Sequence, residues 1–169
     1  MEFRIYDASA FYAGIPFASS DSGITSTLIF EEIQHIKKNH GAIETLLSTG
    51  RLKILDPTAD SMKFITEQAR KTGDIQKLSI ADMSGIALAF ELKSKLITDD
   101  FAVSNLAKNL RIHVEPIMTK GIRDVGRWIY YCAGCKKEFV GEEFCDQCGN
   151  KLNRKLIKES FKKNHSHKN

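Results

Sequence analysis

Four cysteines, the only ones among the 169 residues of the chain, lie in two C-x-x-C pairs. The pairs are Cys132/Cys135 and Cys145/Cys148, and nine residues separate them. This spacing is typical of a ribbon-type zinc site, because Zn²⁺ favours four thiolates in tetrahedral geometry. A closed shell of four thiolates leaves no position for water, so we expect the zinc to be structural. Rubredoxin-like iron is the alternative metal, and a disulfide pairing fits less well.

The segment around the cysteines is short. About 25 residues cannot bury enough apolar surface to fold alone, so bound metal would supply the missing stability. Gly134 lies within the first pair and Gly149 just after the second. We expect both glycines to take positive φ, which the turns of such a site require.

Five acidic residues form a second group that could do chemistry. Acids follow expected strands at Asp7 and at Asp99 and Asp100, Asp82 lies in the first turn of an expected helix, and Glu32 lies on the first long helix. The carboxyl ends of the strands form the ligand-binding edge of an open α/β sheet. Carboxylates gathered there repel each other and need a cation, and Mg²⁺ and Mn²⁺ prefer oxygen ligands. One or two such ions can activate water for phosphodiester hydrolysis.

Each acid also has a structural explanation. Asp7 could cap the next turn, Asp82 is well placed against a helix dipole, and Glu32 could lie on a solvated face. The pair Asp99 and Asp100 could simply form a turn. Apolar residues flank all of these acids in the sequence. Such flanks bury the neighbours and leave the acids at the rim of the sheet, which favours a shared site.

Alternating strands and helices must position these groups. Strands are predicted at residues 3–6, 52–55, 96–98 and 112–115, and helices at 28–38, 42–50, 60–73, 78–94 and 101–110. The stretch at 13–23 is rich in Gly, Ser and Pro and is predicted to be a loop. Ser79 and Asp82 have the spacing of a capping box, in a variant with aspartate at the third position. The alternation indicates an α/β fold with a small, mostly parallel sheet and helices on both faces.

The composition, 42% hydrophobic and 27% charged, is that of a globular protein. The sequence has no apolar run of about 20 residues, and its start lacks the pattern of a signal peptide. We therefore expect a cytoplasmic protein that binds no membrane. Residues 1–125 carry 15 basic and 16 acidic side chains, whereas residues 126–169 carry 10 and 5. The basic end suits a polyanion such as nucleic acid, although it could also be only a solubilising end.

Basic and aromatic residues near the cysteines are candidates for binding RNA. Basic side chains would contact phosphates, and aromatic rings would stack on unpaired bases. The alternative role for the aromatic residues is packing within the ribbon, which we favour for Phe139. The basic candidates are Lys136, Lys137, Lys151, Arg154 and Lys155, and the aromatic ones are Trp128, Tyr130 and Tyr131.

The order of the acidic motifs resembles that of the PIN-domain nucleases. The motifs are "IYDASAF", "FEEI", "LSIADMSGIALA" and "LITDDF". The resemblance spans about residues 3–117 and implies a PIN-like three-layer fold and a metal-dependent ribonuclease. It implies that Asp7, Glu32, Asp82 and Asp100 hold Mg²⁺ or Mn²⁺, directly or through water. Asp99 could share the role of Asp100, and Thr98 could hold a water or a ligand.

A zinc ribbon after a PIN domain resembles the endonucleases that cut precursor small-subunit ribosomal RNA at its 3′ end. The segments "ITDDFAVSNLA" and "WIYYCAGC" are similar to that family, and the absence of long insertions matches its compact archaeal form. The implied partners are precursor ribosomal RNA, the small ribosomal particle and assembly factors. The alternatives are a toxin-type PIN ribonuclease acting on transfer or messenger RNA, and a non-catalytic assembly factor that binds ribosomal RNA. The expected division is a nuclease domain at 1–117, a linker at 118–127, a zinc ribbon at 128–152 and a flexible basic tail at 153–169.

Overall fold

A computed structural model of the chain describes residues 3–34, 40–118, 125–140 and 142–159. Its first sheet has five strands in the order β3-β2-β1-β4-β5, and neighbouring strands are parallel. The strands are β1 Arg4–Tyr6, β2 Gly23–Thr25, β3 Leu52–Ile54, β4 Lys95–Ile97 and β5 Val114–Glu115. The predicted α/β fold with a mostly parallel sheet is confirmed.

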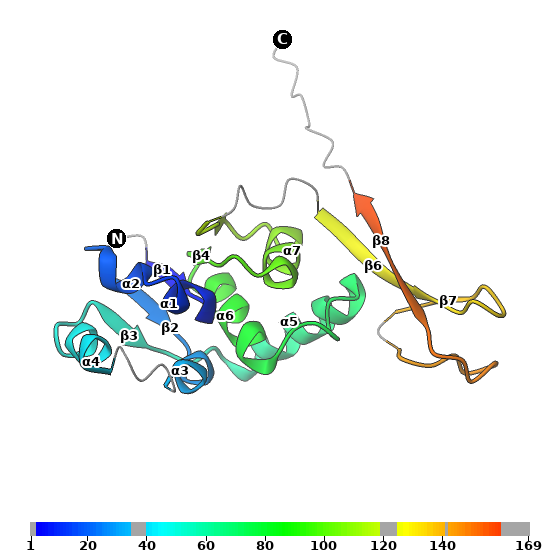
Figure 1. Cartoon of the computed structure of the whole chain (residues 1–169), viewed down its shortest axis with the longest axis horizontal. Coiled ribbons are helices and arrows are strands. Elements are labelled where there is room, and N and C mark those ends of the chain that lie inside the picture. The colour runs from blue at the N-terminus through cyan, green and yellow to red at the C-terminus, as the bar shows by residue number, and fades with distance from the viewer. Residues whose placement is uncertain (1–2, 35–39, 119–124, 141, 160–169) are drawn as a thin grey trace, which may run out of the picture.

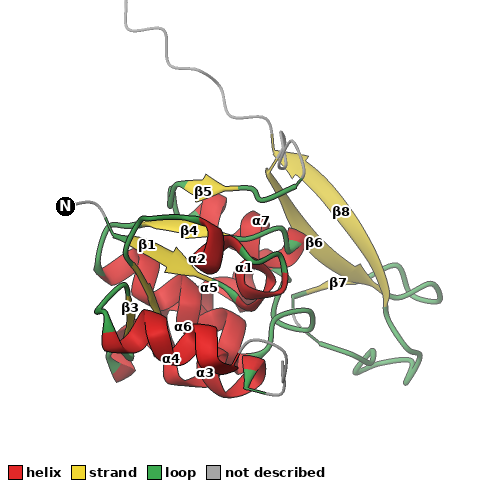
Figure 2. Ribbon diagram, turned by 60° about the vertical axis from the view of Figure 1, so that its left-hand side comes forward, coloured by secondary structure: helices red, strands yellow, loops and turns green. Residues whose placement is uncertain are grey.

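Helices cover both faces of this sheet, as Figure 2 shows. They are α1 Ala8–Tyr12, α2 Ile15–Ala18, α3 Thr27–Ile33, α4 His40–Ser48, α5 Ala59–Thr72, α6 Ile80–Glu91 and α7 Phe101–Asn109. Ile5 and Leu96 pack in one core with α5, α6 and α7, whereas the next residues, Tyr6 and Ile97, pack in the other core with α1, α3 and α4. This alternation follows from the two-residue period of a strand and gives three layers.

The stretch at 13–23 that was predicted to be a loop contains α2, and β2 begins at its last residue, Gly23. Ser, Asp and Gly residues, which are typical of loops, precede and begin this strand, and they concealed it in the sequence. Gly23 is required at the start of β2, because an added Cβ would lie 1.9 Å from a ring carbon of Tyr6. The predicted helix at 28–38 is α3 up to Ile33, and its end at 35–39 lies outside the described residues.

A second sheet contains β6 Val125–Tyr131, β7 Glu138–Phe139 and β8 Asn153–Glu159, all antiparallel, in the order β7-β6-β8. Figure 1 shows β6 and β8 as a long pair beside α5 and α7, with the cysteine loops beyond β7. We call this second sheet with its loops the ribbon. None of the helices in the described part of the chain is both long and apolar enough to cross a bilayer.

Two predicted boundaries differ from the structure. Strand β6 begins at Val125, inside the predicted linker, and residues 153–159 of the predicted flexible tail form β8. The two strands pair residue by residue from Val125↔Glu159 to Tyr131↔Asn153. The sequence of β8 shows no alternation, because its two apolar residues, Leu156 and Ile157, are adjacent, and the strand is held by pairing with β6, which is distant in the sequence. Residues 119–124 and 160–169 lie outside the described residues.

Candidate active site and metal centre

Asp7 lies at the carboxyl end of β1 and is 3% exposed. Its Oδ2 accepts hydrogen bonds from Thr98 Oγ1 at 2.6 Å and from Ser9 Oγ at 3.0 Å. Asp7 also stands at the N-cap position of α1, but its side chain makes no capping hydrogen bond there. Capping therefore does not explain this buried carboxylate, and two hydroxyls from different elements fix its orientation.

The surroundings of Asp7 oppose its negative charge. Burial is the main cause that raises the pKa of Asp7 above its ordinary value, and the negative charge of Asp82 raises it further. The hydrogen bonds from Thr98 and Ser9 act in the opposite direction, because they stabilise the ionised form. A divalent cation would stabilise the ionised form of Asp7, because it would offset both the burial and the negative charge of Asp82.

Asp82 is half-buried in the first turn of α6. It forms the predicted capping box: its Oδ2 accepts from the backbone N–H of Ser79 at 2.7 Å, and its own N–H donates to Ser79 Oγ at 3.0 Å. These bonds fix the start of α6 and hold the carboxylate close enough to Asp7 to affect its pKa. Capping and a role at the site are therefore compatible in this residue.

Glu32 is exposed on α3, and its charge acts on Tyr12, as the charge of Asp7 does. The charges of Glu32 and Asp7 both raise the pKa of Tyr12, after the larger effect of burial. Tyr12 is 55% exposed, so this carboxylate rim is open to solvent. Neither Tyr12 nor Ser9 was predicted as a site residue, and the only sequence signal for them is their position just after Asp7.

The two aspartates after β4 have different surroundings. Both oxygens of Asp99 accept backbone hydrogen bonds at 2.8 Å, from Ile117 and Met118, so this side chain fastens the segment after β5. Asp100 is exposed and caps α7 by accepting from Val103 N–H at 2.9 Å through Oδ1. This difference favours Asp100 over Asp99 as the fourth acid.

The acids form a loose constellation. Among the residues that the structure describes, no three carboxylates bring their oxygens within 4.8 Å of one another; the cysteines alone form such a group. The fit to a cation therefore rests on Asp7 and Asp82, because the charge of Asp82 acts directly on Asp7.

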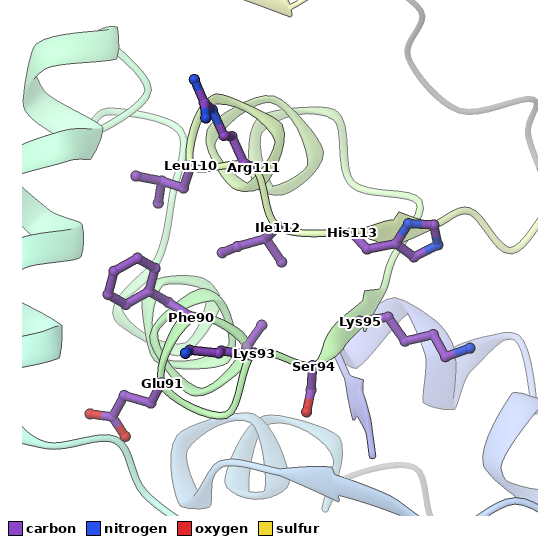
Figure 3. A pocket seen from close by; sticks show the side chains of 10 residues that line it. Phe90, Glu91, Lys93, Ser94, Lys95, Leu110, Arg111, Ile112 and His113 are labelled. Atoms are coloured by element: carbon purple, nitrogen blue, oxygen red, sulfur yellow. The ribbon is translucent and has the colours of Figure 1, made fainter. Parts of the chain in front are cut away.

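A separate pocket lies away from these acids. It measures about 480 Å³ and lies where α6 ends and β4 begins, at the opposite edge of the sheet from the acids. Figure 3 shows Lys93, Lys95, Arg111 and His113 at this pocket, with Glu91 the one acid labelled there. It lacks converging carboxylates, so it does not fit a hard divalent cation.

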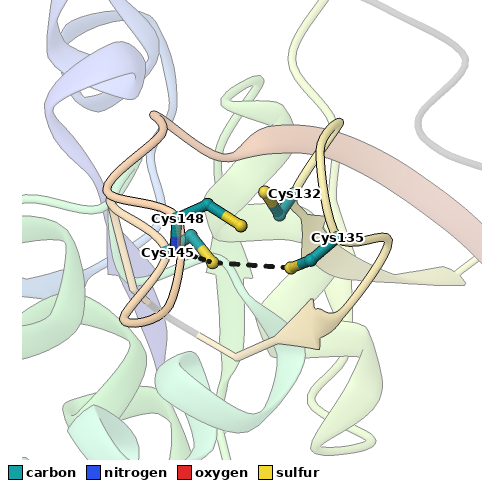
Figure 4. Close-up of side chains that lie close together, drawn as sticks. All are labelled: Cys132, Cys135, Cys145 and Cys148. Carbon is teal, nitrogen blue, oxygen red and sulfur yellow. Dashed lines mark hydrogen bonds between the residues drawn. The ribbon is translucent and has the colours of Figure 1, made fainter.

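The four cysteine sulfurs all lie within 4.8 Å of one another. Figure 4 shows the four side chains gathered at one place between the loops. The Sγ atoms of Cys135 and Cys145 are 3.6 Å apart. Four sulfurs at about 2.3 Å from a tetrahedral Zn²⁺ would be roughly 3.8 Å apart, whereas a disulfide needs about 2.05 Å. All four cysteines are free thiols, so the geometry fits a metal site and excludes a disulfide.

Hydrogen bonds at the cysteines shift the pKa values of two thiols in opposite directions. A hydrogen bond from the backbone of Cys135 is the main cause that lowers the pKa of Cys132 to about 6. Hydrogen bonding with Cys135 is the main cause that raises the pKa of Cys148 to about 12. Four thiolates cannot coexist at this distance without a cation, and Zn²⁺ would supply that charge.

The prediction of positive φ is confirmed for Gly149, at +65°, and is wrong for Gly134. In the first pair the left-handed residue is Lys136, at +64°, which follows Cys135 as Gly149 follows Cys148. Gly134 is needed for space, since an added Cβ would lie 3.1 Å from Asn150 Nδ2 and under 4 Å from two cysteine sulfurs.

Three of the predicted RNA-binding residues lie at the junction between the ribbon and the α/β domain. Tyr130 is 2% exposed and donates from its hydroxyl to Gly73 O at 2.8 Å. The guanidinium of Arg154 covers the ring of Trp128 at 3.6 Å and lies 3.9 Å from Asp74. Tyr130 therefore cannot stack on a base in this fold, and its prediction as an RNA contact is wrong.

The other predicted basic residues are exposed. Lys136, Lys137, Lys151 and Lys155 all face solvent. Lys136, Lys155 and Tyr131 lie together on one face of the ribbon. Tyr130 points to the opposite face, because neighbouring residues of a strand alternate. The alternation of β6 and its pairing with β8 decide which of these side chains face solvent, and their role as RNA contacts stays a prediction.

Comparison with known proteins agrees with this geometry. Residues 5–92 match the family described as "PIN domain of ribonuclease". The chain is 35% identical over 167 residues to Endoribonuclease Nob1 of Methanocaldococcus jannaschii, covering 96% of this chain and 82% of that protein. It is 36% identical over 104 residues to Ribonuclease VapC1 of Thermoplasma acidophilum, covering 61% and 54% respectively. It is 32% identical over 82 residues to the 20S-pre-rRNA D-site endonuclease NOB1 of Saccharomyces cerevisiae, covering 48% and 18%.

Proposed function

The chain belongs to the PIN-domain ribonucleases and is an endoribonuclease, and from this premise we propose that it cleaves precursor small-subunit ribosomal RNA near its 3′ end. The name of the yeast relative supports the substrate, and the match to Nob1 over nearly the whole chain supports placing this chain in ribosomal RNA processing. Membership in an endoribonuclease family argues against the alternative of a non-catalytic assembly factor.

The observation that carries the proposed chemistry is the environment of Asp7. A buried carboxylate with a raised pKa, held by Thr98 and Ser9 and close to Asp82, is suited to a hard divalent cation. We propose that Asp7, Glu32, Asp82 and Asp100 hold Mg²⁺ or Mn²⁺, directly or through water. Such an ion lowers the pKa of water and stabilises negative charge on a leaving oxygen.

The side chains of the protein prepare the site for this reaction. Thr98 and Ser9 keep the Asp7 carboxylate in one orientation, and Ser79 does the same for Asp82. Water would attack the phosphorus in line, the bond from phosphorus to the ribose 3′ oxygen would break, and that oxygen would leave. The oxygen of the water would become part of the new 5′ phosphate, and one of its protons would end on the new 3′ hydroxyl.

The ribbon would select and hold the RNA. Acidic residues that grip phosphate through a cation do not read bases, so selection needs a second surface. The exposed residues Lys136, Lys137, Lys151 and Lys155 would contact phosphates of folded RNA. Zn²⁺ at the four cysteines would keep the loops that carry them in place. The small ribosomal particle is the proposed context of the reaction.

The test is cleavage of a labelled RNA that spans a small-subunit 3′ end, with Mn²⁺ present or omitted. Omission is preferable to a chelator, which would also remove zinc. Asp82→Asn should abolish cleavage and keep the fold, because asparagine retains a capping oxygen. Asp60→Asn is the matched control, since Asp60 is an acid in the first turn of another helix.

The toxin-type alternative is supported by the match to VapC1 and would show in the same assay. Preferential cleavage of transfer or messenger RNA would favour it. Equal cleavage by the Asp82→Asn and Asp60→Asn variants would contradict the proposed catalytic site.

A further inference from the structure

A pocket of about 350 Å³ lies between the start of α7 and the ribbon. The nuclease domain contributes Lys77, Asp100, Phe101 and Ala102, and the ribbon contributes Trp128 and Arg154. Asp100 is one of the acids of the proposed active site. The pocket therefore begins at the catalytic rim and continues to the ribbon, which the proposed function assigns to holding RNA.

The ribbon wall of this pocket is held in a fixed position. Trp128 lies under the guanidinium of Arg154, and Arg154 extends toward Asp74, which is fully buried. Asp74 Oδ2 accepts hydrogen bonds from Thr72 Oγ1 and from Asn105 Nδ2, both at 2.8 Å. Buried groups in such a network cannot move independently, so the wall is organised before a ligand arrives.

The open side of the pocket is aromatic. Phe101 is the first residue of α7 and is 44% exposed, directly after Asp100. Lys77 is exposed at the same pocket, and Arg154 adds a second positive charge. An exposed ring beside cations suits a ligand with a flat apolar face and an anionic chain, which describes a nucleotide of single-stranded RNA.

We propose that this pocket receives one unpaired base of the RNA substrate, close to the phosphate that is cleaved. Phe101 stacks on the base, and Lys77 contacts the neighbouring phosphate. Both are positioning residues, since the acids perform the cleavage. A base-paired nucleotide cannot enter, so the pocket restricts the enzyme to single strands. The inference rests on the proposed function, because the ligand is the RNA that this site cleaves.

The chain contains one tryptophan, Trp128, so its fluorescence reports directly on this pocket. The probe is a single-stranded RNA hexamer of arbitrary sequence, titrated without added Mg²⁺ or Mn²⁺, and the same sequence as a duplex is the comparison. The hexamer should change the emission of Trp128 in a saturable way, and the duplex should not.

Variants at Phe101 identify the stacking contact. Phe101→Ala should weaken binding of the hexamer by about 10-fold, the loss expected for one stacked base. Phe101→Tyr keeps the ring and should bind like the parent protein. Leu92→Ala is the matched control, because Leu92 is 40% exposed but lies at the far end of α6. In cleavage of a short RNA with Mn²⁺, Phe101→Ala should raise KM more than it lowers kcat.

Equal affinities of the parent and Phe101→Ala proteins would overturn the proposal, as would equal responses to hexamer and duplex. Loss of binding in Phe101→Tyr would also count against stacking. The outcome is separable from the proposed function. If the hexamer binds in a Phe101-dependent way but ribosomal precursor is not cleaved selectively, the pocket stands and the ribosomal role is refuted. If ribosomal precursor is cleaved selectively but binding of the hexamer does not depend on Phe101, only the ribosomal role stands.

Discussion

Substitution of Gly73 should loosen the contact between the nuclease domain and the ribbon. Gly73 ends α5 in the left-handed conformation, at φ +76°. An added Cβ would lie 2.2 Å from the carbonyl oxygen of Trp128 and 2.7 Å from its Cβ. The carbonyl oxygen is part of the backbone of β6, and the Cβ is attached directly to that backbone. A side-chain rotation therefore cannot relieve the clash, and the strand must move by about 1 Å to restore an ordinary contact.

Gly50 provides the control for this variant. It has nearly the same conformation, at φ +71°, but an added Cβ there meets nothing within 4 Å. Alanine in the left-handed conformation costs about 1–2 kcal/mol at either position. Gly73→Ala adds the cost of overpacking, about 1–3 kcal/mol. The free energy of unfolding should therefore differ between the variants by about 1–3 kcal/mol.

Thermal unfolding and Trp128 fluorescence together test this prediction. Each kcal/mol corresponds to roughly 2–4 °C in Tm for a chain of this size. Gly73→Ala should melt at a lower temperature than Gly50→Ala, and its emission should shift to longer wavelength as Trp128 becomes solvated. Equal melting temperatures and an unchanged emission maximum would refute the claim that Gly73 forms a tight contact with the ribbon.

Three further predictions concern charge and metal. Asp7→Asn should reduce cleavage by at least about 100-fold. It should not lower the Tm of the protein free of divalent cations, because burial already disfavours the charge of Asp7; a lower Tm would show that ionised Asp7 stabilises the fold. The protein free of divalent cations should become more stable as pH falls through the raised pKa of Asp7 and less stable as pH rises through it, because burial favours the protonated carboxyl in the folded protein; the same pH profile in Asp7→Asn would contradict the assignment to Asp7. Cys145→Ser should release the ribbon metal and leave Trp128 emission unchanged, because Tyr130 and Arg154 dock without the cysteines; a red shift would show that metal maintains the junction.

The sequence by itself determined the local features of this protein. Each C-x-x-C pair brings two thiols together because it is one turn of chain, and Ser79 reaches Asp82 because only three positions separate them at a helix start. Short-range geometry governs these features, so the spacing of residues is sufficient to predict them. The α/β class was also predictable, because the alternation of apolar strands and amphipathic helices is a property of the sequence.

Tertiary structure decided which of two possible partners each side chain meets. The alternation in β6 shows that Tyr130 and Tyr131 face opposite sides, but the pattern is the same whichever side is buried. Contact with Gly73 buries Tyr130, so Tyr131 remains on the face with Lys155. Asp99 and Asp100 differ in the same way, because only the path of the chain after β5 brings backbone N–H groups to Asp99. These outcomes depend on segments that are distant in the sequence, and no local pattern of residues encodes which distant segment will arrive.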